Sequence, residues 1–378
     1  MSELPILPVT NVGTWPRSKD LLRAQKQKEE IGEEAFQEEA DKAVIEVLEL
    51  QERAGVDLVT DGEQRRDNFF SFVADKLDGV EMMTLSEMLD IIEDKEMYEE
   101  MLKTLDVPAY AISNATCVGE IEQVEPLALK EFEFTKQHTD KPIKVTLPGP
   151  YLLTRAMFVP EVSRPHYEEK EDLGDVVVDL LRNEITRLID AGAAFIQMDE
   201  PVLTELVFSP ENTRTFMCAA LAEGKDPEEE LAFARDLMNR VVEGIEGARL
   251  GCHVCRGNWS DDESILLEGD YNPLIPFLKD MNVDQLVLEY STERAGDLVE
   301  FSDKEIGYGV LNPRTKEIES EDTIRRRIER ALELYDSDRI FLNPDCGFAT
   351  FSERPVNNRE IAFEKLQTLS RVAEEFRN

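Results

Sequence analysis

The chain has 378 residues and is short of positive charge. Its 42 lysines and arginines stand against 81 aspartates and glutamates, which gives a formal net charge of −39. Nucleic acid and anionic membranes are poor partners for such a protein, because binding to them needs clustered Lys and Arg. The acidic residues are spread over helical segments such as 29–39 and 228–230. This pattern predicts the solvated acidic surface of halophilic proteins, whose self-repulsion is screened by high salt.

The sequence also lacks a disulfide framework and targeting segments. Five cysteines in a chain of this length are too few for a cross-linked secreted domain. The start at 1–5 has no basic region followed by an apolar run, and no apolar stretch approaches the length of a membrane span. We therefore expect a cytoplasmic protein whose thiols are available to bind a metal ion.

Several common catalytic motifs are missing as well. There is no Walker loop, no G-x-G-x-x-G after a strand, no H-E-x-x-H and no G-x-S-x-G. Phosphoryl transfer, nicotinamide chemistry, zinc proteolysis and serine hydrolysis are therefore unsupported.

Short apolar runs alternate with amphipathic helical patterns, which is typical of βα units around a parallel sheet. Strands are expected at residues 6–12, 57–60, 143–147, 194–198, around 253–255, 285–289, 306–310 and 339–343. Helices are expected at residues 18–54, 173–190, 228–245, 323–335 and 359–376. This alternation predicts an α/β fold, a single TIM (β/α)8 barrel made of residues 1–378. Its chemistry would lie at the carboxyl ends of the strands.

The segment between the second and third expected strands is much longer than a usual loop. It contains a helical pattern near 85–105 and a strand-like stretch at 110–122. We expect residues 67–125 to form an insertion. It either packs on the outside of the barrel or, as its origin at the active end favours, forms a flap over the barrel mouth.

One strand-like stretch ends in soft metal ligands. Side chains alternate along a strand, so His253 and Cys255 should face one way and Cys252 the other. An imidazole and a thiolate on one face supply half of a tetrahedral zinc site. Two further strand ends offer the other half. The expected zinc ligands are His253, Cys255, Glu289 and Cys346.

The same stretch allows two other interpretations. Cys252 and Cys255 have the C-x-x-C spacing of redox dithiols and of half a zinc knuckle. A knuckle needs a second such pair, which the sequence lacks, and a dithiol needs both thiols on one side. Alternatively, His253 and Cys255 are ordinary core residues. The matching strand end at Asn343–Gly347 favours the metal site over both alternatives.

Short polar motifs stand at the ends of the expected strands. They are Val12–Pro16, Asp61–Glu63, Pro148–Pro150, Gln197–Pro201, His253–Cys255, Leu288–Glu289, Gly309–Val310 and Asn343–Gly347. In this order, and across nearly the whole chain, they resemble the C-terminal catalytic barrel of the cobalamin-independent methionine synthase family. The chain is similar to the short archaeal members of that family, which have only this barrel.

The resemblance implies a zinc-dependent methyltransferase that methylates the thiol of L-homocysteine to give L-methionine. It implies that the substrate amino group binds Asp199 and Glu63, the two candidate catalytic residues. The substrate carboxylate would meet the backbone at Gly13 and Thr14. Zn2+ deprotonates a bound thiol without a strong base. The thiolate can then attack a methyl group that the protein holds in line.

The methyl donor is left open by three positions that differ from the folate-using pattern. Thr116 stands where that pattern has Arg, Ala156 where it has a stacking Trp, and no histidine lies near Arg314. A methyltetrahydrofolate-type donor and a methylcobalamin-type donor are therefore both candidates. A corrinoid carrier protein, or a separate protein like the absent N-terminal domain, is a candidate partner.

Other functions are compatible with these residues. The same chemistry on another thiol, such as coenzyme M, would not need Asp199 and Glu63, because that substrate has no amino group. A closed zinc site with four protein ligands would indicate a non-catalytic zinc-binding partner subunit. Finally, Asp199 and Glu63 would be ordinary barrel-mouth carboxylates if they were paired with Arg65 or Arg66.

Overall fold

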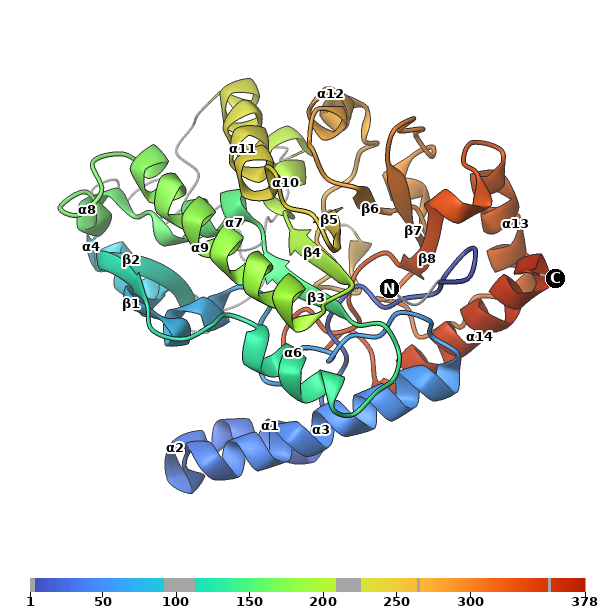
Figure 1. Ribbon diagram of the computed structural model, residues 1–378, viewed down its shortest axis with the longest axis horizontal. Coiled ribbons are helices and arrows are strands. Elements are labelled where there is room, and N and C mark those ends of the chain that lie inside the picture. The colour runs from blue at the N-terminus through green and yellow to red at the C-terminus, as the bar shows by residue number, and fades with distance from the viewer. Residues whose placement is uncertain (1–3, 92–112, 209–225, 264–265, 353–354, 378) are drawn as a thin grey trace.

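The computed structural model describes residues 4–91, 113–208, 226–263, 266–352 and 355–377. Six parallel strands form the central sheet in chain order from β3 to β8 (Figure 1). They are β3 Lys144–Pro148, β4 Phe195–Asp199, β5 Arg249–Val254, β6 Gln285–Glu289, β7 Glu305–Leu311 and β8 Ile340–Pro344. Almost every residue in these strands is buried, as in a parallel sheet whose faces are both covered. The prediction of parallel βα architecture is confirmed for this part of the chain.

The segments expected as the first two strands, 6–12 and 57–60, form isolated parallel bridges instead. The bridged pairs are Val9–Leu342, Thr10–Leu58 and Val59–Ile143. They connect β8 to the first segment, the first segment to the second, and the second segment to the residue before β3. The predicted position of both segments beside the sheet is confirmed, but the prediction of regular strands is wrong.

Side chains replace the missing ladder bonds in both segments. The N–H of Val9 donates to the Asp57 carboxylate at 2.8 Å. The side-chain amide of Gln51, which lies on a helix, donates to the carbonyl of Thr60 at 2.7 Å and accepts from its N–H at 3.1 Å. Backbone groups that are satisfied in this way have no need of a neighbouring strand.

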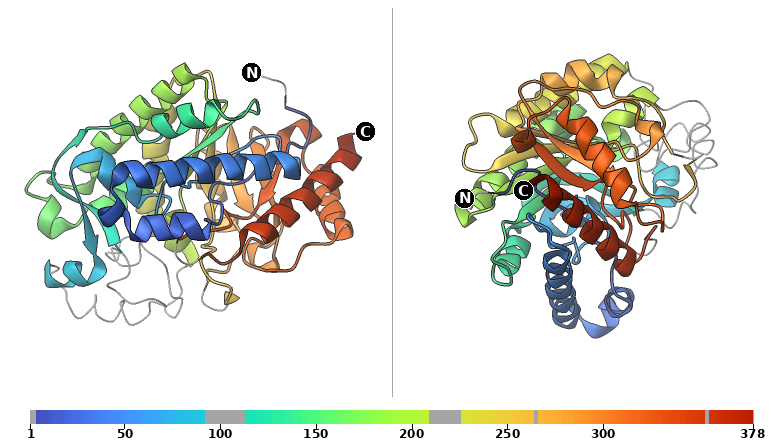
Figure 2. Two further views of the ribbon diagram at one scale, coloured as in Figure 1. Left: turned by 90° about the horizontal axis from the view of Figure 1, so that it is seen from below. Right: turned by 90° about the vertical axis from the view of Figure 1, so that its right-hand side faces the viewer.

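Helices cover the outside of the sheet (Figures 1 and 2). The long helices are α3 Glu33–Ala54, α9 Lys170–Ala191, α11 Pro227–Val242, α13 Glu321–Leu332 and α14 Arg359–Arg377. The short helices are α1 Lys19–Lys26, α2 Lys28–Ile31, α4 Leu85–Ile91, α6 Leu129–Lys136, α7 Pro150–Met157, α8 Pro160–Ser163, α10 Val202–Phe208 and α12 Ile275–Lys279. The 3-10 helices are η1 Ser71–Lys76, η5 Asn272–Leu274, η6 Glu293–Ala295 and η7 Ser337–Arg339. None of the helices in the described ranges combines the length and apolarity that a membrane crossing requires.

The long helix expected at 18–54 is interrupted. Ser18 caps its start, as its hydroxyl accepts the N–H of Leu21 at 3.1 Å, and Gly55 ends it in the left-handed conformation. Between these ends the chain turns at Gly32, where φ is +81°. Helix α1 therefore folds back along α3, and α3 packs against α14 (Figure 2).

A two-stranded antiparallel sheet precedes β3 in the chain. Its strands are β1 Leu77–Thr84 and β2 Ser113–Gln123. The helix expected at 85–105 is present as α4 up to Ile91, and the stretch expected at 110–122 is a strand from Ser113 onward. The remainder of both predictions lies outside the described residues.

Candidate metal centre and substrate pocket

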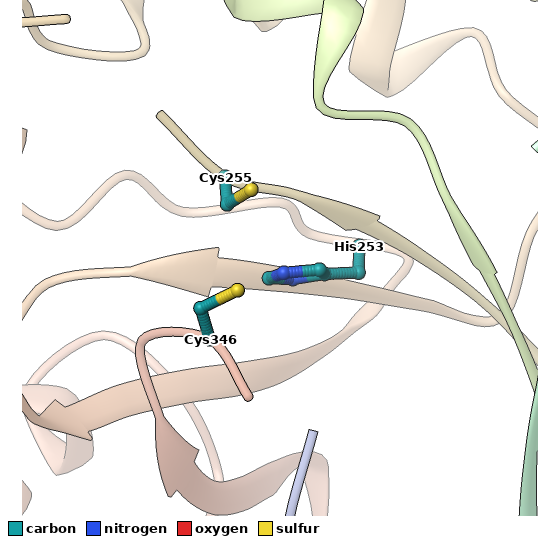
Figure 3. A group of neighbouring side chains, drawn as sticks. All are labelled: His253, Cys255 and Cys346. Carbon is teal, nitrogen blue, oxygen red and sulfur yellow. The ribbon is translucent and has the colours of Figure 1, made fainter. Parts of the chain in front are cut away.

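Three of the four expected metal ligands meet at the carboxyl ends of the strands (Figure 3). His253 belongs to β5, Cys255 directly follows β5, and Cys346 lies two residues after β8. One potential ligand atom of each side chain lies within 4.8 Å of the other two. His253 and Cys255 are buried, and Cys346 is partly exposed. Residues remote in the sequence meet here because parallel strands all end at the same edge of a sheet.

The histidine is prepared to bind a metal ion through one ring nitrogen. Nδ1 of His253 lies 3.1 Å from the carbonyl oxygen of Val287, and a carbonyl only accepts, so Nδ1 carries the proton. Nε2 is buried and has no hydrogen-bond partner among the described residues. Metal-bound histidines commonly donate their second nitrogen to a backbone carbonyl in this way. The unsatisfied Nε2 is therefore the observation that fits these residues to a metal ion.

The electrostatics of the group favour a thiolate. Hydrogen bonding to Cys346 and the positive charge of a protonated His253 lower the pKa of Cys255 to about 5, against the effect of burial. The same bond to Cys255 raises the pKa of Cys346. Burial acts to lower the pKa of His253, but Cys255 and the Asp199 carboxylate raise it to about 9. The two thiols thus share a proton that a divalent cation would replace, and a His–Cys–Cys donor set suits Zn2+.

Glu289, the fourth expected ligand, does not join this group in the structure. Its buried carboxylate accepts hydrogen bonds from the N–H of Arg256 at 2.9 Å, the side-chain amide of Asn258 and the guanidinium of Arg294 at 3.2 Å. Burial acts to raise the pKa of Glu289, but Arg294 and Arg256 lower it. The carboxylate is therefore anionic and held by three donors, and its role as a metal ligand remains a prediction. No sequence motif pointed to these three partners.

A cavity adjoins the three converging ligands. It is lined by every residue expected to bind substrate, namely Gly13, Thr14, Glu63 and Asp199. The rest of its wall includes large apolar side chains, Phe69, Leu152, Trp259 and Leu267. The cavity therefore combines carboxylates and soft ligands with an apolar wall, a combination typical of small-molecule sites.

Glu63 is held in an unusual backbone conformation at the cavity wall. Its φ is +52°, which is uncommon for a residue with a side chain, and its N–H donates to Asp61 at 2.9 Å. Oε1 accepts the hydroxyl of Thr146 at 2.8 Å, whereas Oε2 is buried and has no partner among the described residues. A Cβ at Gly13 would overlap Oε1, so a larger residue there would displace the Glu63 carboxylate. Burial raises the pKa of Glu63 to about 7.

Asp199 ends β4 beside Glu63 and is also buried. One carboxylate oxygen accepts the side-chain amide of Gln197 at 2.8 Å, and burial raises the pKa of Asp199 to about 6. The arginines proposed as alternative partners form their ion pairs with other carboxylates, although the charge of Arg66 acts to lower the pKa of Glu63. Arg65 pairs with Asp41 at 2.5 Å, and Arg66 pairs with Glu131 at 2.7 Å. The two cavity carboxylates are therefore available to a cationic ligand group.

Glu205 is a cavity residue that the sequence did not single out. It lies on α10, and burial raises its pKa well above the usual range. It stands outside every motif in a largely apolar helix, so no pattern indicated it.

The three positions that distinguish the chain from the folate-using pattern are not among the residues that line the cavity. Thr116 and Ala156 are fully buried, and Arg314 donates to Asn258 at 3.0 Å and pairs with Glu263.

The protein has a parallel α/β fold with a histidine and two cysteines at its strand ends. These features define a class of protein that has a candidate soft-metal centre beside a small-molecule cavity. A family model described as "Cobalamin-independent synthase, Catalytic domain" matches residues 7–375. The chain belongs to the cobalamin-independent methionine synthase family.

Relatives of full length support this assignment. A "Methionine synthase" of Sulfurisphaera tokodaii is 29% identical, and the match covers 100% of this chain and 96% of the relative. One of Pyrococcus furiosus is 29% identical over 96% of this chain and 91% of the relative. The fold resembles a B12-independent methionine synthase from Shewanella sp. W3-18-1 in complex with selenomethionine, with a TM-score of 0.71, 21% identity and 98% of each chain covered. It also resembles a putative Listeria monocytogenes enzyme of that type, with a TM-score of 0.72, 23% identity and 99% of each chain covered.

Proposed function

We propose that this protein is a zinc-dependent S-methyltransferase that methylates the thiol of L-homocysteine to give L-methionine. The observation that carries the proposal is the position of the cavity. Its wall contains the three soft ligands His253, Cys255 and Cys346 together with the unpaired carboxylate oxygen of Glu63. An amino acid with a thiol needs both features at once. Family membership and the "Methionine synthase" relatives support the same reaction.

The residues of this chain have separate tasks in the proposed reaction. His253, Cys255 and Cys346 would hold Zn2+, with Glu289 as the expected fourth ligand, and the bound ion would lower the pKa of a substrate thiol. Glu63 and Asp199 bind the substrate ammonium group, and the backbone at Gly13 and Thr14 receives its carboxylate. The apolar wall of the cavity limits water around the thiolate and so preserves its nucleophilicity. Position and charge, rather than a strong base, therefore drive the transfer.

We propose that the fold is a single (β/α)8 barrel made of residues 1–378. The three isolated parallel bridges support this, since they link β8 to β3 through the two N-terminal segments. We also propose that residues 67–125, of which 92–112 lie outside the described residues, form an insertion after the second segment and act as a flap over the mouth. A cytoplasmic, halophilic protein agrees with the scarcity of cysteine and the net charge of −39.

The donor and the partners are part of the proposal. A methyltetrahydrofolate-type donor agrees with the family, whereas the residues at Thr116, Ala156 and Arg314 leave room for a methylcobalamin-type donor on a corrinoid protein. A folate donor needs a proton on its leaving nitrogen, and a corrinoid donor does not. The identity of the donor therefore decides whether the cavity must supply an acid.

The test is an assay of methionine formation from homocysteine. The protein, purified in high salt, is given methyltetrahydrofolate or methylcobalamin, with and without a chelator. We expect methionine with at least one donor, loss of activity with the chelator, and recovery with added Zn2+. Activity that survives complete removal of metal would contradict the proposal.

A further inference from the structure

Asp345 lies immediately before Cys346 and is almost completely buried. One of its oxygens, Oδ1, accepts the N–H of Tyr290 at 3.0 Å and the N–H of Ser291 at 2.9 Å. Its other oxygen accepts the hydroxyl of Ser291. Tyr290 and Ser291 directly follow β6, and Asp345 directly follows β8. One carboxylate therefore joins the ends of two strands that are not neighbours in the sheet.

Strand β7 lies between those two strands, and its sequence makes room for the connection. A Cβ at Gly309 would overlap Oδ1 of Asp345, would lie 2.8 Å from the Leu288 carbonyl oxygen on β6 and would come within 3.0 Å of the Asp345 Cα. The φ of Gly309 is not positive, so its backbone conformation does not require glycine. The close approach of the Asp345 carboxylate on one side and of the Leu288 carbonyl on the other does require it. Gly309 and Asp345 thus form one arrangement that spans three strands.

The other side of Cys346 is fixed by the N-terminal segment. The N–H of Phe348 donates to the carbonyl of Thr14 at 3.0 Å. A Cβ at Gly347 would overlap the Thr14 hydroxyl. Cys346 is therefore held between two attachments, one made by a carboxylate and the other by a close backbone contact. It is the one ligand of the three that lies in a loop two residues beyond its strand, so its position depends on these attachments.

We propose that Asp345 is a positioning residue for the metal centre. By attaching the loop after β8 to the end of β6, it keeps the Cys346 thiol within reach of His253 and Cys255. Both of its oxygens are occupied by donors, so it acts through the backbone and not as a ligand. The inference rests on the proposed zinc site and deepens it.

The test compares two buried carboxylates of the same kind. Glu184 accepts the N–H groups of Ala128 at 2.7 Å and Leu129 at 2.9 Å on the helical side of the fold. It is a matched control for Asp345. Asp345→Ala and Glu184→Ala are titrated with Co2+, and the thiolate-to-cobalt absorption band and the affinity against a competing chelator are measured. Thermal unfolding of both variants is followed in parallel.

We expect both substitutions to lower Tm, but only Asp345→Ala to alter the cobalt band and to weaken Co2+ binding, by about 10- to 100-fold. Asp345→Asn should restore affinity to within about threefold of the original, because its amide oxygen still accepts both backbone N–H groups. Asp345→Ala that loses stability like Glu184→Ala but keeps the cobalt band and affinity would overturn the proposal.

A second variant covers the case in which Asp345→Ala does not fold. Gly309→Ala displaces the carboxylate without removing its charge, although it also crowds the Leu288 carbonyl on β6, and we expect the same loss of Co2+ affinity. A folded Gly309→Ala with unchanged affinity would also overturn the proposal. If the original protein binds no Co2+, the proposed function itself fails. If it binds Co2+ and every variant binds equally well, only the role of Asp345 fails.

Discussion

The two halves of the pocket are built on different kinds of backbone. The proposed metal half, with His253, Cys255 and Cys346, stands at the ends of β5 and β8, whose neighbours pair with them over several residues, with one irregularity in the β7–β8 pairing at Gly309–Leu311. The proposed amino-acid half has Asp199 on the regular strand β4, but its other members, Thr14 and Glu63, stand on segments that make only isolated bridges. There, side chains and a strained turn at Glu63 fix the geometry.

The difference indicates that the two halves tolerate amino-acid substitutions to different degrees. A ladder spreads a local disturbance over many bonds, so the metal half should fail only when a ligand or its attachment is removed. The amino-acid half depends on single contacts such as that between Glu63 and Thr146. A single substitution there should weaken substrate binding and leave metal binding intact.

The largest effect is expected from a substitution that removes one of the proposed metal ligands. Cys346→Ser removes a soft ligand, and we expect Zn2+ affinity to fall by at least about 100-fold, since second-shell changes alone cost 10- to 100-fold. Metal content after dialysis measures the effect. Cys117→Ser is the control, because Cys117 is a buried thiol outside the site. Retention of stoichiometric zinc by Cys346→Ser would disprove the assigned ligand.

The next largest effect is expected from a substitution that weakens amino-acid binding and leaves metal binding unchanged. Glu63→Gln keeps the shape but removes the charge that faces the substrate ammonium group. A hydrogen bond to a charged group contributes about 1.5–3 kcal/mol, so we expect methionine, the product, to bind about 10- to 100-fold more weakly. Calorimetry measures this, and Co2+ affinity should not change. Joint loss of metal and methionine binding would show that the halves are not separable.

A smaller effect follows from pH. Burial raises the pKa of Glu63 to about 7, so this carboxyl is neutral below that pH and charged above it. Methionine has no thiol, and its ammonium group stays charged in this range. We expect methionine to bind about tenfold more weakly at about pH 6 than at about pH 8. Most of this dependence should vanish in Glu63→Gln, and a dependence of the opposite sign would refute the assignment.

The smallest difference between the halves is expected from salt. The net charge of −39 is distributed over the surface, and raising the salt concentration from about 0.1 M to about 1 M shortens the screening length. We expect Tm to rise, while metal and methionine affinities change by a similar, small factor. A selective loss of methionine binding would mean that a free ion competes for the cavity carboxylates.

The sequence predicts the metal half better than the amino-acid half, and the reason is physical. Apolar runs that end in a motif predict strands, so β6 begins and ends as expected and His253 lies on β5. The segments around Val9 and Thr60 have the same apolar pattern, but Asp57 and Gln51 take their backbone bonds. Such side-chain bonds between distant residues leave no periodic pattern in the sequence.

The site was predictable as a set of residues but not as a set of contacts. Motif ends brought Glu63, Asp199 and the three soft ligands into one expected site. No pattern indicated that Glu289 would be held by Arg256 and Arg294, or that Asp345 would reach across β7. These contacts depend on which donors the completed fold places nearby.

The contact between Thr14 and Phe348 has a consequence for synthesis of the protein. Thr14 on one wall of the pocket is translated long before the loop that carries Cys346. A nascent chain therefore has the Thr14 wall before it has the third proposed ligand, and all three proposed ligands can meet only after the chain has been translated past Cys346. The proposed metal centre would therefore assemble late in folding, after the earlier strands of the sheet have been made.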